Sequence, residues 1–262
     1  MFPRGWFVVA FAEQVGPAAA VPLRYFGQTL SMHRDDAGGV HVTDGDGGER
    51  LVLERNGLVF VHHDASGAPP RFDIPVLPEH GHPDWQPWVH KCMHLRTHSR
   101  EIVENVADRA HFLPVHDTVN ETFETEFVDH IAVQRSTGRG GAHPEVTFTS
   151  EATYYGPGYQ ITRIETLGVK ALLVNAHTMI DAASLDLRFG VMMKSTRHSQ
   201  RFVESYIDML QKGFEQDVRI WEHKVWREHP VLCDGDGPIM KLRRWYAQFY
   251  PGSGYAASSE GP

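Results

Sequence analysis

The residues with the clearest chemical potential lie in the stretch ENVADRAHFLPVH. Asn105, Asp108 and His111 are spaced three residues apart, which places them on one face of a helix. His116 follows five residues after His111, and Pro114 lies between the two histidines. Because imidazole is a common metal ligand, an amide, a carboxylate and two histidines in this order suggest a metal site.

Pro114 bears on whether both histidines can reach one ion. On an ideal helix of roughly 3.6 residues per turn, residues five apart point about 140° away from each other. Proline lacks a backbone donor and disfavours helical angles at the residue before it, here Leu113. The sequence therefore predicts that the helix ends at this proline and that His116 swings back toward His111.

Asp217 is the predicted third ligand. It interrupts a stripe of large apolar residues with steps of four, four, four, three and four, formed by Phe202, Tyr206, Leu210, Phe214, Asp217 and Trp221. A lone carboxylate in such a stripe is costly unless it is paired or bound to a cation. Two histidines and one carboxylate form the facial triad typical of non-haem Fe(II), although zinc accepts the same ligand types.

Each of these residues also has an ordinary structural interpretation. A single histidine is more often a surface or hydrogen-bonded core residue than a ligand, and HFLPVH alone is a weak signal. Asp217 could instead pair with Arg219 or Lys224. The combined pattern D-x-x-H-x-x-x-x-H, with its internal proline and the later helical aspartate, favours the metal site over these alternatives.

The elements that must position these residues predict an α+β fold. Residues 6–63 form short strands rich in β-branched and aromatic residues. A proline-rich linker over 68–88 precedes a helix with Ser99 as its expected N-cap. Longer hairpin strands over 123–195 form a large antiparallel sheet, and a long helix over 199–224 packs on it.

We expect two domains and a tail. Residues 1–72 form a small antiparallel β unit, and residues 73–250 form the catalytic domain with the large sheet and the long helix. A shorter helix, IMKLRRWYAQFY, closes that domain, and residues 251–262 are predicted to be disordered.

Composition excludes several functional classes. The net charge of −8 and the lack of a dense Lys/Arg run argue against a nucleic-acid partner. Two distant cysteines, Cys92 and Cys233, do not make a disulfide scaffold, so we expect a cytoplasmic protein.

No apolar run approaches the roughly 20 residues of a membrane span. The start, MFPRGWFVVAFAEQ, is interpreted as a strand because it lacks a clean signal-peptide cleavage pattern.

The central motif resembles that of the α subunits of Rieske-type non-haem iron oxygenases, N-x-x-D-x-x-H-x-x-x-x-H. Asn105, Asp108, His111 and His116 match it position for position, and FEQDVRIWEHK supplies the matching Asp217. GWFVVAFAEQV and NGLVFVHHD resemble strands of the family's Rieske domain. GPIMKLRRWYAQFY resembles the oxygenase components of 3-ketosteroid 9α-hydroxylases and the related sterol 7-desaturases.

The resemblance implies a role for each matched residue. His111, His116 and Asp217 would hold Fe(II), in a helix-grip catalytic domain. Asp108 would hydrogen-bond a ligand histidine and link it to the Rieske cluster of a neighbouring subunit. Asn105 would lie near the iron. The family forms head-to-tail trimers, so a homotrimer is expected here.

The resemblance also implies a small apolar, steroid-like substrate. The substrate would occupy a cavity between the large sheet and the long helix. Phe112, Phe202 and Phe214 are candidate walls of this cavity, with core packing as the alternative role for each.

The chain departs from the family at the Rieske cluster, which needs C-x-H and C-x-x-H pairs. Cys92-Met93-His94 imitates the first pair but lies after the β unit, and Cys233 is followed by Asp-Gly-Asp. Where the cluster segment is expected, between GVHVTD and LVLERNG, the chain has only GDGGER, which we interpret as a short turn closing over a deleted cluster-binding subdomain. We therefore expect no [2Fe–2S] cluster in this chain and interpret residues 1–72 as a truncated Rieske-like remnant.

Three functional hypotheses follow. The first is an iron oxygenase that takes electrons from a separate Rieske or ferredoxin protein. The second is a metal-dependent hydrolase, lyase or isomerase that needs no reductant. The third is a ligand-binding homologue that does no chemistry. Iron, zinc or no metal in the purified protein would separate them.

Overall fold

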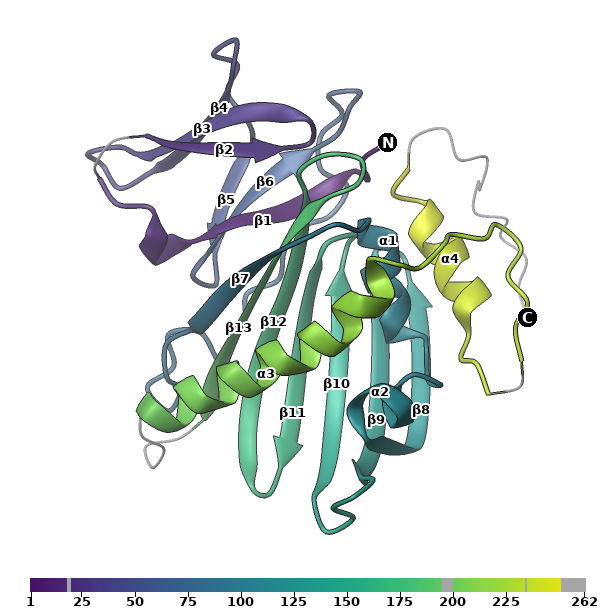
Figure 1. The fold of residues 1–262 in the computed structure, drawn as a ribbon. Helices are drawn as coiled ribbons and strands as arrows, with labels where there is room; N and C mark the ends of the chain where they lie inside the picture. Colours follow the sequence, from purple (N-terminus) through teal and green to yellow (C-terminus); the bar gives the residue numbers. More distant parts are fainter. Residues whose placement is uncertain (18–19, 195–199, 234, 251–262) are drawn as a thin grey trace.

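Two bodies of β-structure make up the fold, with one long helix across the larger body (Figure 1). The computed structural model describes residues 1–17, 20–194, 200–233 and 235–250. A small unit of two three-stranded sheets lies against one end of a seven-stranded sheet. The predicted α+β class, with a small β unit, a large antiparallel sheet and a long helix, is confirmed.

The small unit contains the first six strands, and its two sheets enclose an apolar core. One sheet has the order β1-β6-β5 and the other β2-β3-β4. All seven residues of β1 are buried, because one face packs on the second sheet and the other on the large sheet. The elements are β1 (Gly5–Phe11), the 3₁₀ turn η1 (Ala12–Gln14), β2 (Val21–Tyr25), β3 (Gln28–Arg34), β4 (Val40–Asp44), β5 (Val52–Arg55) and β6 (Leu58–His63).

A tight turn joins β4 to β5, where the sequence predicted one. Asp44 Oδ1 accepts hydrogen bonds from the backbone N–H groups of Asp46 and Gly48, at 3.1 and 2.8 Å. The Asp44 N–H in turn donates to the carbonyl oxygen of Gly48 at 2.9 Å. Gly47 has φ +82°, a conformation that favours glycine.

The large sheet is antiparallel throughout and has the order β7-β13-β12-β11-β10-β9-β8. The predicted hairpin strands are present, but the sequence did not predict β7, which is one edge of this sheet. Cys92, which the sequence placed only after the β unit, therefore lies in a strand of the larger body. The strands are β7 (Val89–Leu95), β8 (Thr118–Val128), β9 (Ile131–Gly140), β10 (Thr147–Tyr155), β11 (Tyr159–Thr166), β12 (Val169–Met179) and β13 (Leu185–Lys194).

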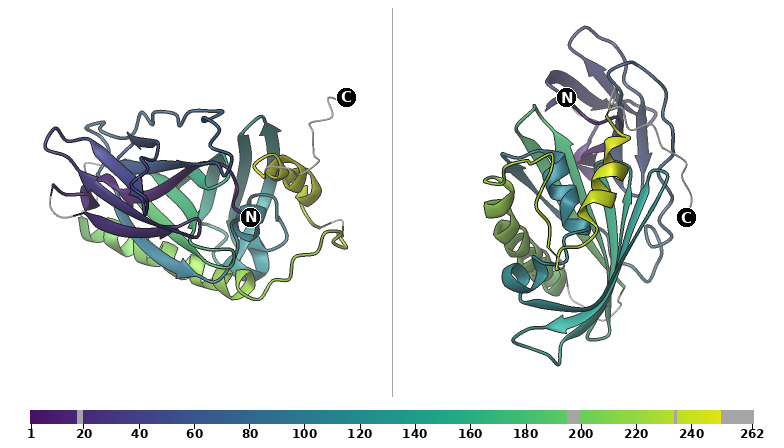
Figure 2. Two further views of the ribbon diagram at one scale, coloured as in Figure 1. Left: turned by 90° about the horizontal axis from the view of Figure 1, so that it is seen from above. Right: turned by 90° about the vertical axis from the view of Figure 1, so that its right-hand side faces the viewer.

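The long helix, α3, crosses one face of the large sheet (Figures 1 and 2). Its apolar stripe packs on β7 and β13 through Val203, Ile207 and Trp221. No helix of the described residues is long and apolar enough to cross a membrane. The helices are α1 (Ser99–Val103), the 3₁₀ turn η2 (Glu104–Val106), α2 (Phe112–His116), α3 (Gln200–Trp221) and α4 (Ile239–Ala247).

Polar contacts fasten the small unit to the large sheet. The Tyr25 hydroxyl donates to Asp186 Oδ2 at 2.6 Å and accepts from Arg188 Nη2 at 2.5 Å. The Thr178 hydroxyl donates to the carbonyl oxygen of Val8 at 2.6 Å. The predicted domain boundary between residues 72 and 73 falls in the irregular segment between β6 and β7 and stays a prediction. The predicted disordered tail, 251–262, lies outside the described residues.

Candidate metal centre

The backbone between η2 and α2 differs from the predicted one. The first helix begins with Ser99 itself, after an N-cap at His98, and helical structure ends at Val106. Pro114 does not end a helix: it is the third residue of α2, where its missing N–H would have no helical partner anyway. The prediction of a proline-broken helix is therefore wrong, and the break precedes His111.

Asp108 accounts for this earlier break. Its Oδ1 lies 3.3 Å from the backbone nitrogen of His111, so the side chain competes with helical hydrogen bonding. Gly237 also passes so close to the backbone of Ala107 that no side chain would fit between them. The predicted single helical face of Asn105, Asp108 and His111 is thus divided among a 3₁₀ turn, a loop and the N-cap of α2.

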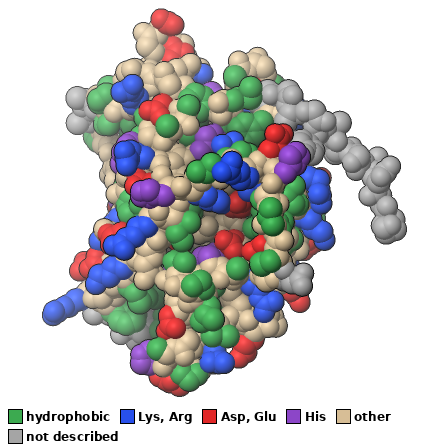
Figure 3. All heavy atoms as spheres, turned by 45° about the vertical axis from the view of Figure 1, so that its right-hand side comes forward, with side chains coloured by type: hydrophobic (Ala, Val, Ile, Leu, Met, Phe, Trp, Pro, Cys, Tyr) green, Lys and Arg blue, Asp and Glu red, His purple; other side chains and the backbone are tan. Residues whose placement is uncertain are grey.

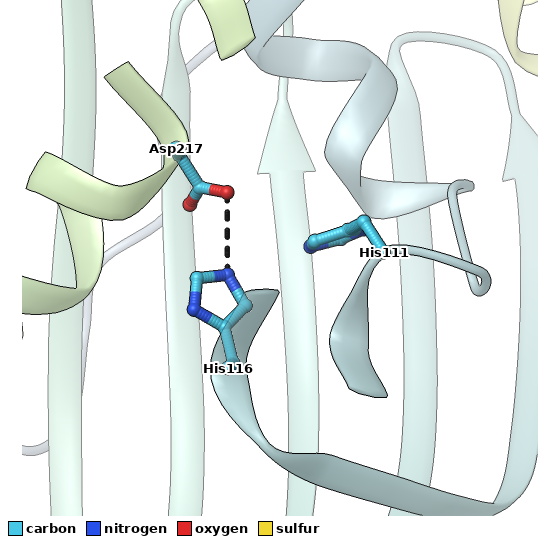
Figure 4. A group of neighbouring side chains, drawn as sticks. All are labelled: His111, His116 and Asp217. Atoms are coloured by element: carbon cyan, nitrogen blue, oxygen red, sulfur yellow. Dashed lines mark ion pairs between the residues drawn. The ribbon is translucent and has the colours of Figure 1, made fainter. Parts of the chain in front are cut away.

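The three predicted ligands nevertheless converge. His111, His116 and Asp217 each offer a ligand atom, and these atoms all lie within 4.8 Å of one another. His116 Nε2 lies 3.2 Å from Asp217 Oδ1, and the two imidazole rings are 5.3 Å apart between centroids. Figure 4 shows the two imidazoles and the carboxylate turned toward one another, from α2 and its N-cap on one side and from α3 on the other.

Asp217 is buried, and its partner is His116. The alternative partner Lys224 instead pairs with Glu101 on α1 and Glu104 on η2. Burial by itself lowers the pKa of His116, but the Asp217 carboxylate and the Gln216 amide oxygen outweigh it and raise that pKa above its usual value. In the absence of a metal, the carboxylate therefore favours the protonated imidazole.

The tautomers of both histidines favour ligation through Nε2. His111 Nδ1 lies 2.6 Å from the backbone oxygen of Asp108, and His116 Nδ1 lies 3.2 Å from Gln216 Oε1. Both partners are acceptors, so each holds a proton on Nδ1, while Nε2 of His116 also faces the Asp217 carboxylate. When the rings are neutral and carry that proton, Nε2 is the nitrogen that can bind a cation.

Asp108 and Asn105 both lie next to the triad. The Asp108 carboxylate is 3.7 Å from His111 Nδ1, too long for a hydrogen bond, so its backbone oxygen orients the ring. Burial by itself raises the pKa of Asp108, but its contacts with His111 outweigh burial and hold that pKa below the usual value. Asn105 lines the cavity beside His111, and its Oδ1 accepts from Trp221 Nε1 at 3.2 Å.

A cavity of about 400 Å³ lies between the large sheet and α3, and the triad forms part of its wall. Phe112 and Phe214 line it as predicted. Phe202 does not: its side chain is 42% exposed, so its predicted role as a wall is wrong. Figure 3 shows acidic and histidine side chains beside hydrophobic ones near the middle of one face of the molecule.

Several polar residues of the cavity were not predicted. Among them, Gln134 lines it from β9 and Asn175 from β12. Their Nε2 and Oδ1 atoms are buried without hydrogen-bond partners among the described residues. The sequence carried a signal for Gln134, because strand alternation places it on the same face as the buried Ala132.

The residues present fit a small divalent cation. Imidazole nitrogens and carboxylate oxygens bind such ions at about 2.0–2.2 Å, so ligand atoms within 4.8 Å of one another need only a small contraction. Three protein ligands leave positions open toward the cavity, as a catalytic site requires.

Comparison with known proteins identifies similar chains. Residues 61–250 match the family described as the 3-ketosteroid 9α-hydroxylase C-terminal domain. An oxygenase component of 3-ketosteroid-9-alpha-monooxygenase from Rhodococcus rhodochrous is 37% identical over 220 residues, which are 76% of this chain and 56% of that protein. This chain thus covers little more than half of that relative.

A second oxygenase component of that name, also from Rhodococcus rhodochrous, is 31% identical to this chain. The alignment includes 95% of this chain and 84% of that protein. The alignment spans 317 residues against the 262 of this chain, so at least 55 of its positions have no counterpart here.

Among solved structures, dicamba monooxygenase bound to 3,6-dichlorosalicylic acid has a similar fold. Its TM-score is 0.75 at 14% identity, over 94% of this chain and 96% of that one.

Proposed function

Because this chain belongs to the 3-ketosteroid 9α-hydroxylase C-terminal-domain family, we propose that it is a non-haem iron oxygenase acting on a steroid-like apolar substrate. The observation that supports the proposal most directly is the convergence of His111, His116 and Asp217 in the wall of a cavity. A structural ion pair would need only His116 and Asp217, whereas a third ligand aimed at the same point favours a cation.

In this proposal the triad holds Fe(II), which supplies the site where dioxygen is activated when the metal is bound. The protein's own residues bind and orient. Asp108 fixes the ring of His111 through its carbonyl oxygen, and Trp221 holds the Asn105 oxygen so that the amide nitrogen remains available toward the cavity. Phe112 and Phe214 shield the substrate from water.

The overall reaction needs an external reductant. Hydroxylation consumes one C–H bond, one dioxygen, two electrons and two protons, and yields one alcohol and one water. Desaturation consumes the same oxidant, electrons and protons but removes two hydrogens from the substrate and yields two waters. Since two cysteines in these positions do not provide the four ligands of a Rieske cluster, we propose that a separate Rieske or ferredoxin protein donates the electrons.

Several finer assignments accompany this proposal. The substrate is a 3-ketosteroid or a similarly flat molecule, by analogy with the named activity of the relatives. The chain assembles as a homotrimer and works in the cytoplasm. Residues 1–72 are a Rieske-like remnant in which the Asp44 turn replaces the cluster-binding loops. The alignment positions of the longer relative that this chain lacks support this assignment.

Elemental analysis and turnover together test the proposal. We expect iron in the protein purified under anaerobic conditions, and substrate-dependent dioxygen consumption with androst-4-ene-3,17-dione when a ferredoxin and its reductase are added. Product mass should rise by one oxygen or fall by two hydrogens. Asp217→Ala is the control that should lose both metal and turnover.

The alternative functions give different outcomes in the same experiment. Zinc in the protein, with substrate conversion that needs no reductant, would replace the oxygenase by a hydrolase, lyase or isomerase. Steroid binding without any metal would leave a ligand-binding protein. Either result overturns the oxygenase proposal.

A further inference from the structure

Gln216 lies immediately before the ligand Asp217 on α3, and the two side chains contact the same imidazole. Asp217 Oδ1 is 3.2 Å from His116 Nε2, and Gln216 Oε1 is 3.2 Å from His116 Nδ1. Both ring nitrogens are thus held by consecutive residues of a helix that is 100 residues away in the sequence.

We propose that Gln216 is a positioning residue that fixes His116 as an Nε2 ligand. An amide oxygen only accepts hydrogen bonds, so Gln216 holds a proton on Nδ1, and the ring keeps that proton when a cation replaces the proton between Nε2 and Asp217. The Nε2 lone pair then points to the Asp217 side, where the cation would bind. Without this acceptor, the proton could move to Nε2 and block ligation, and the ring could rotate away from the triad.

The two histidines are oriented by different means. His111 Nδ1 lies 2.6 Å from the backbone oxygen of Asp108, an acceptor that no substitution removes. His116 depends on a side chain, so its orientation can be tested by mutation. Gln216 is also exposed, so replacing it removes a hydrogen bond without opening a hole in the core.

A hydrogen-bond acceptor on the ring nitrogen that does not bind the metal has a measurable effect on metal affinity. Such a partner fixes the tautomer and ring orientation and makes the bound nitrogen more basic, and its loss typically weakens metal binding by roughly 10–100-fold. A carboxylate at the same position would keep an acceptor in place. Glutamate is therefore the conservative replacement, and leucine is the disruptive one.

This inference rests on the metal site of the proposed function. The experiment measures the affinity of the full chain for Zn(II) and, under anaerobic conditions, for Fe(II). We expect Gln216→Leu to weaken both affinities by about 10–100-fold and Gln216→Glu to restore them to near the wild-type value. Gln211→Leu is the matched control: it makes the same change on the same helix, at a residue that contacts Lys91 and Glu215, and should leave affinity unchanged.

Nitrogen-15 spectra of the Zn(II)-loaded, histidine-labelled protein give a second readout. The wild type should show a protonated Nδ1 and a metal-bound Nε2 at His116, and Gln216→Leu should lose the slow-exchanging Nδ1 proton. A merely structural role on α3 would leave this signal in place.

Three results overturn the inference in distinguishable ways. Wild-type affinity in Gln216→Leu, or an equal loss in Gln211→Leu, removes the role of Gln216 while the metal site stands. No metal uptake by the wild type removes the metal site and the proposed function together.

Discussion

The small β unit and the large sheet with α3 use their polar side chains differently. In the small unit, His41 pairs with Asp35 and Glu49 on the surface, over a core closed by apolar residues of both sheets. In the larger body, the same residue types from α2 and α3 converge inward beside a cavity. Closed packing leaves no room for a ligand, whereas a sheet that carries a helix across one face encloses space.

By this contrast the small unit supports the fold, and the larger body carries the cavity and the three side chains that could hold a metal. The small unit contributes strands, a tight turn and contacts to β12 and β13, while the triad and the cavity wall come from the large body alone. Four predictions test this division, from the largest expected effect to the smallest.

Removing a ligand should abolish metal binding. His111→Ala or Asp217→Ala leaves two ligands, too few to hold the ion, so elemental analysis should find no stoichiometric metal. His41→Ala, in the small unit, is the control and should keep full metal content. If both ligand variants retained their metal, or if His41→Ala lost it, the assignment of metal binding to the larger body would be wrong.

Asp108→Asn should separate metal binding from turnover. Asparagine keeps the backbone oxygen that orients His111, so metal content should not change, while loss of the charge should slow turnover by roughly 10–100-fold. The comparison is made by elemental analysis and dioxygen consumption on the same samples. Full activity would show that the carboxylate has no role in electron delivery.

Breaking a contact between the two bodies should cost stability but not metal. Tyr25→Phe removes the hydroxyl that joins Asp186 and Arg188, and with it two hydrogen bonds to charged groups, which costs about 1–3 kcal/mol in the free energy of unfolding. Urea unfolding measures this loss. Val21→Ala, at an exposed position of the same strand, should be nearly neutral. Loss of metal affinity in Tyr25→Phe would mean that the small unit helps to shape the site.

The smallest effect is a pH dependence of the metal-free protein. The folded pKa of His116 is raised, so its stabilising contribution is fully present below the unfolded value of about 6.5 and is lost as pH rises through the folded value. With a chelator present, the thermal stability of the wild type relative to His116→Asn should therefore fall from pH 6 to pH 8. A difference that does not change with pH would show that the pair with Asp217 is not formed without metal.

The sequence by itself determined the candidate ligands and most of the strands. Residue type and spacing identified His111 and His116, and Asp217 followed because a carboxylate within an apolar helical stripe is costly without a partner. Strand alternation predicted the hairpins of the large sheet, and the Asp44 turn followed from its glycines. These features depend on neighbours in the chain, so local patterns suffice.

Only the tertiary structure decided where the first helix ends, which strand forms the edge of the large sheet and which nitrogen each histidine offers. The break before His111 depends on Asp108 and on the approach of Gly237, far along the chain. The edge strand β7 exists because β13 supplies its hydrogen bonds, and the orientation of His116 depends on Gln216, 100 residues away. Apart from the local contacts of Asp108 with His111, these outcomes come from contacts between distant segments, which no local pattern records.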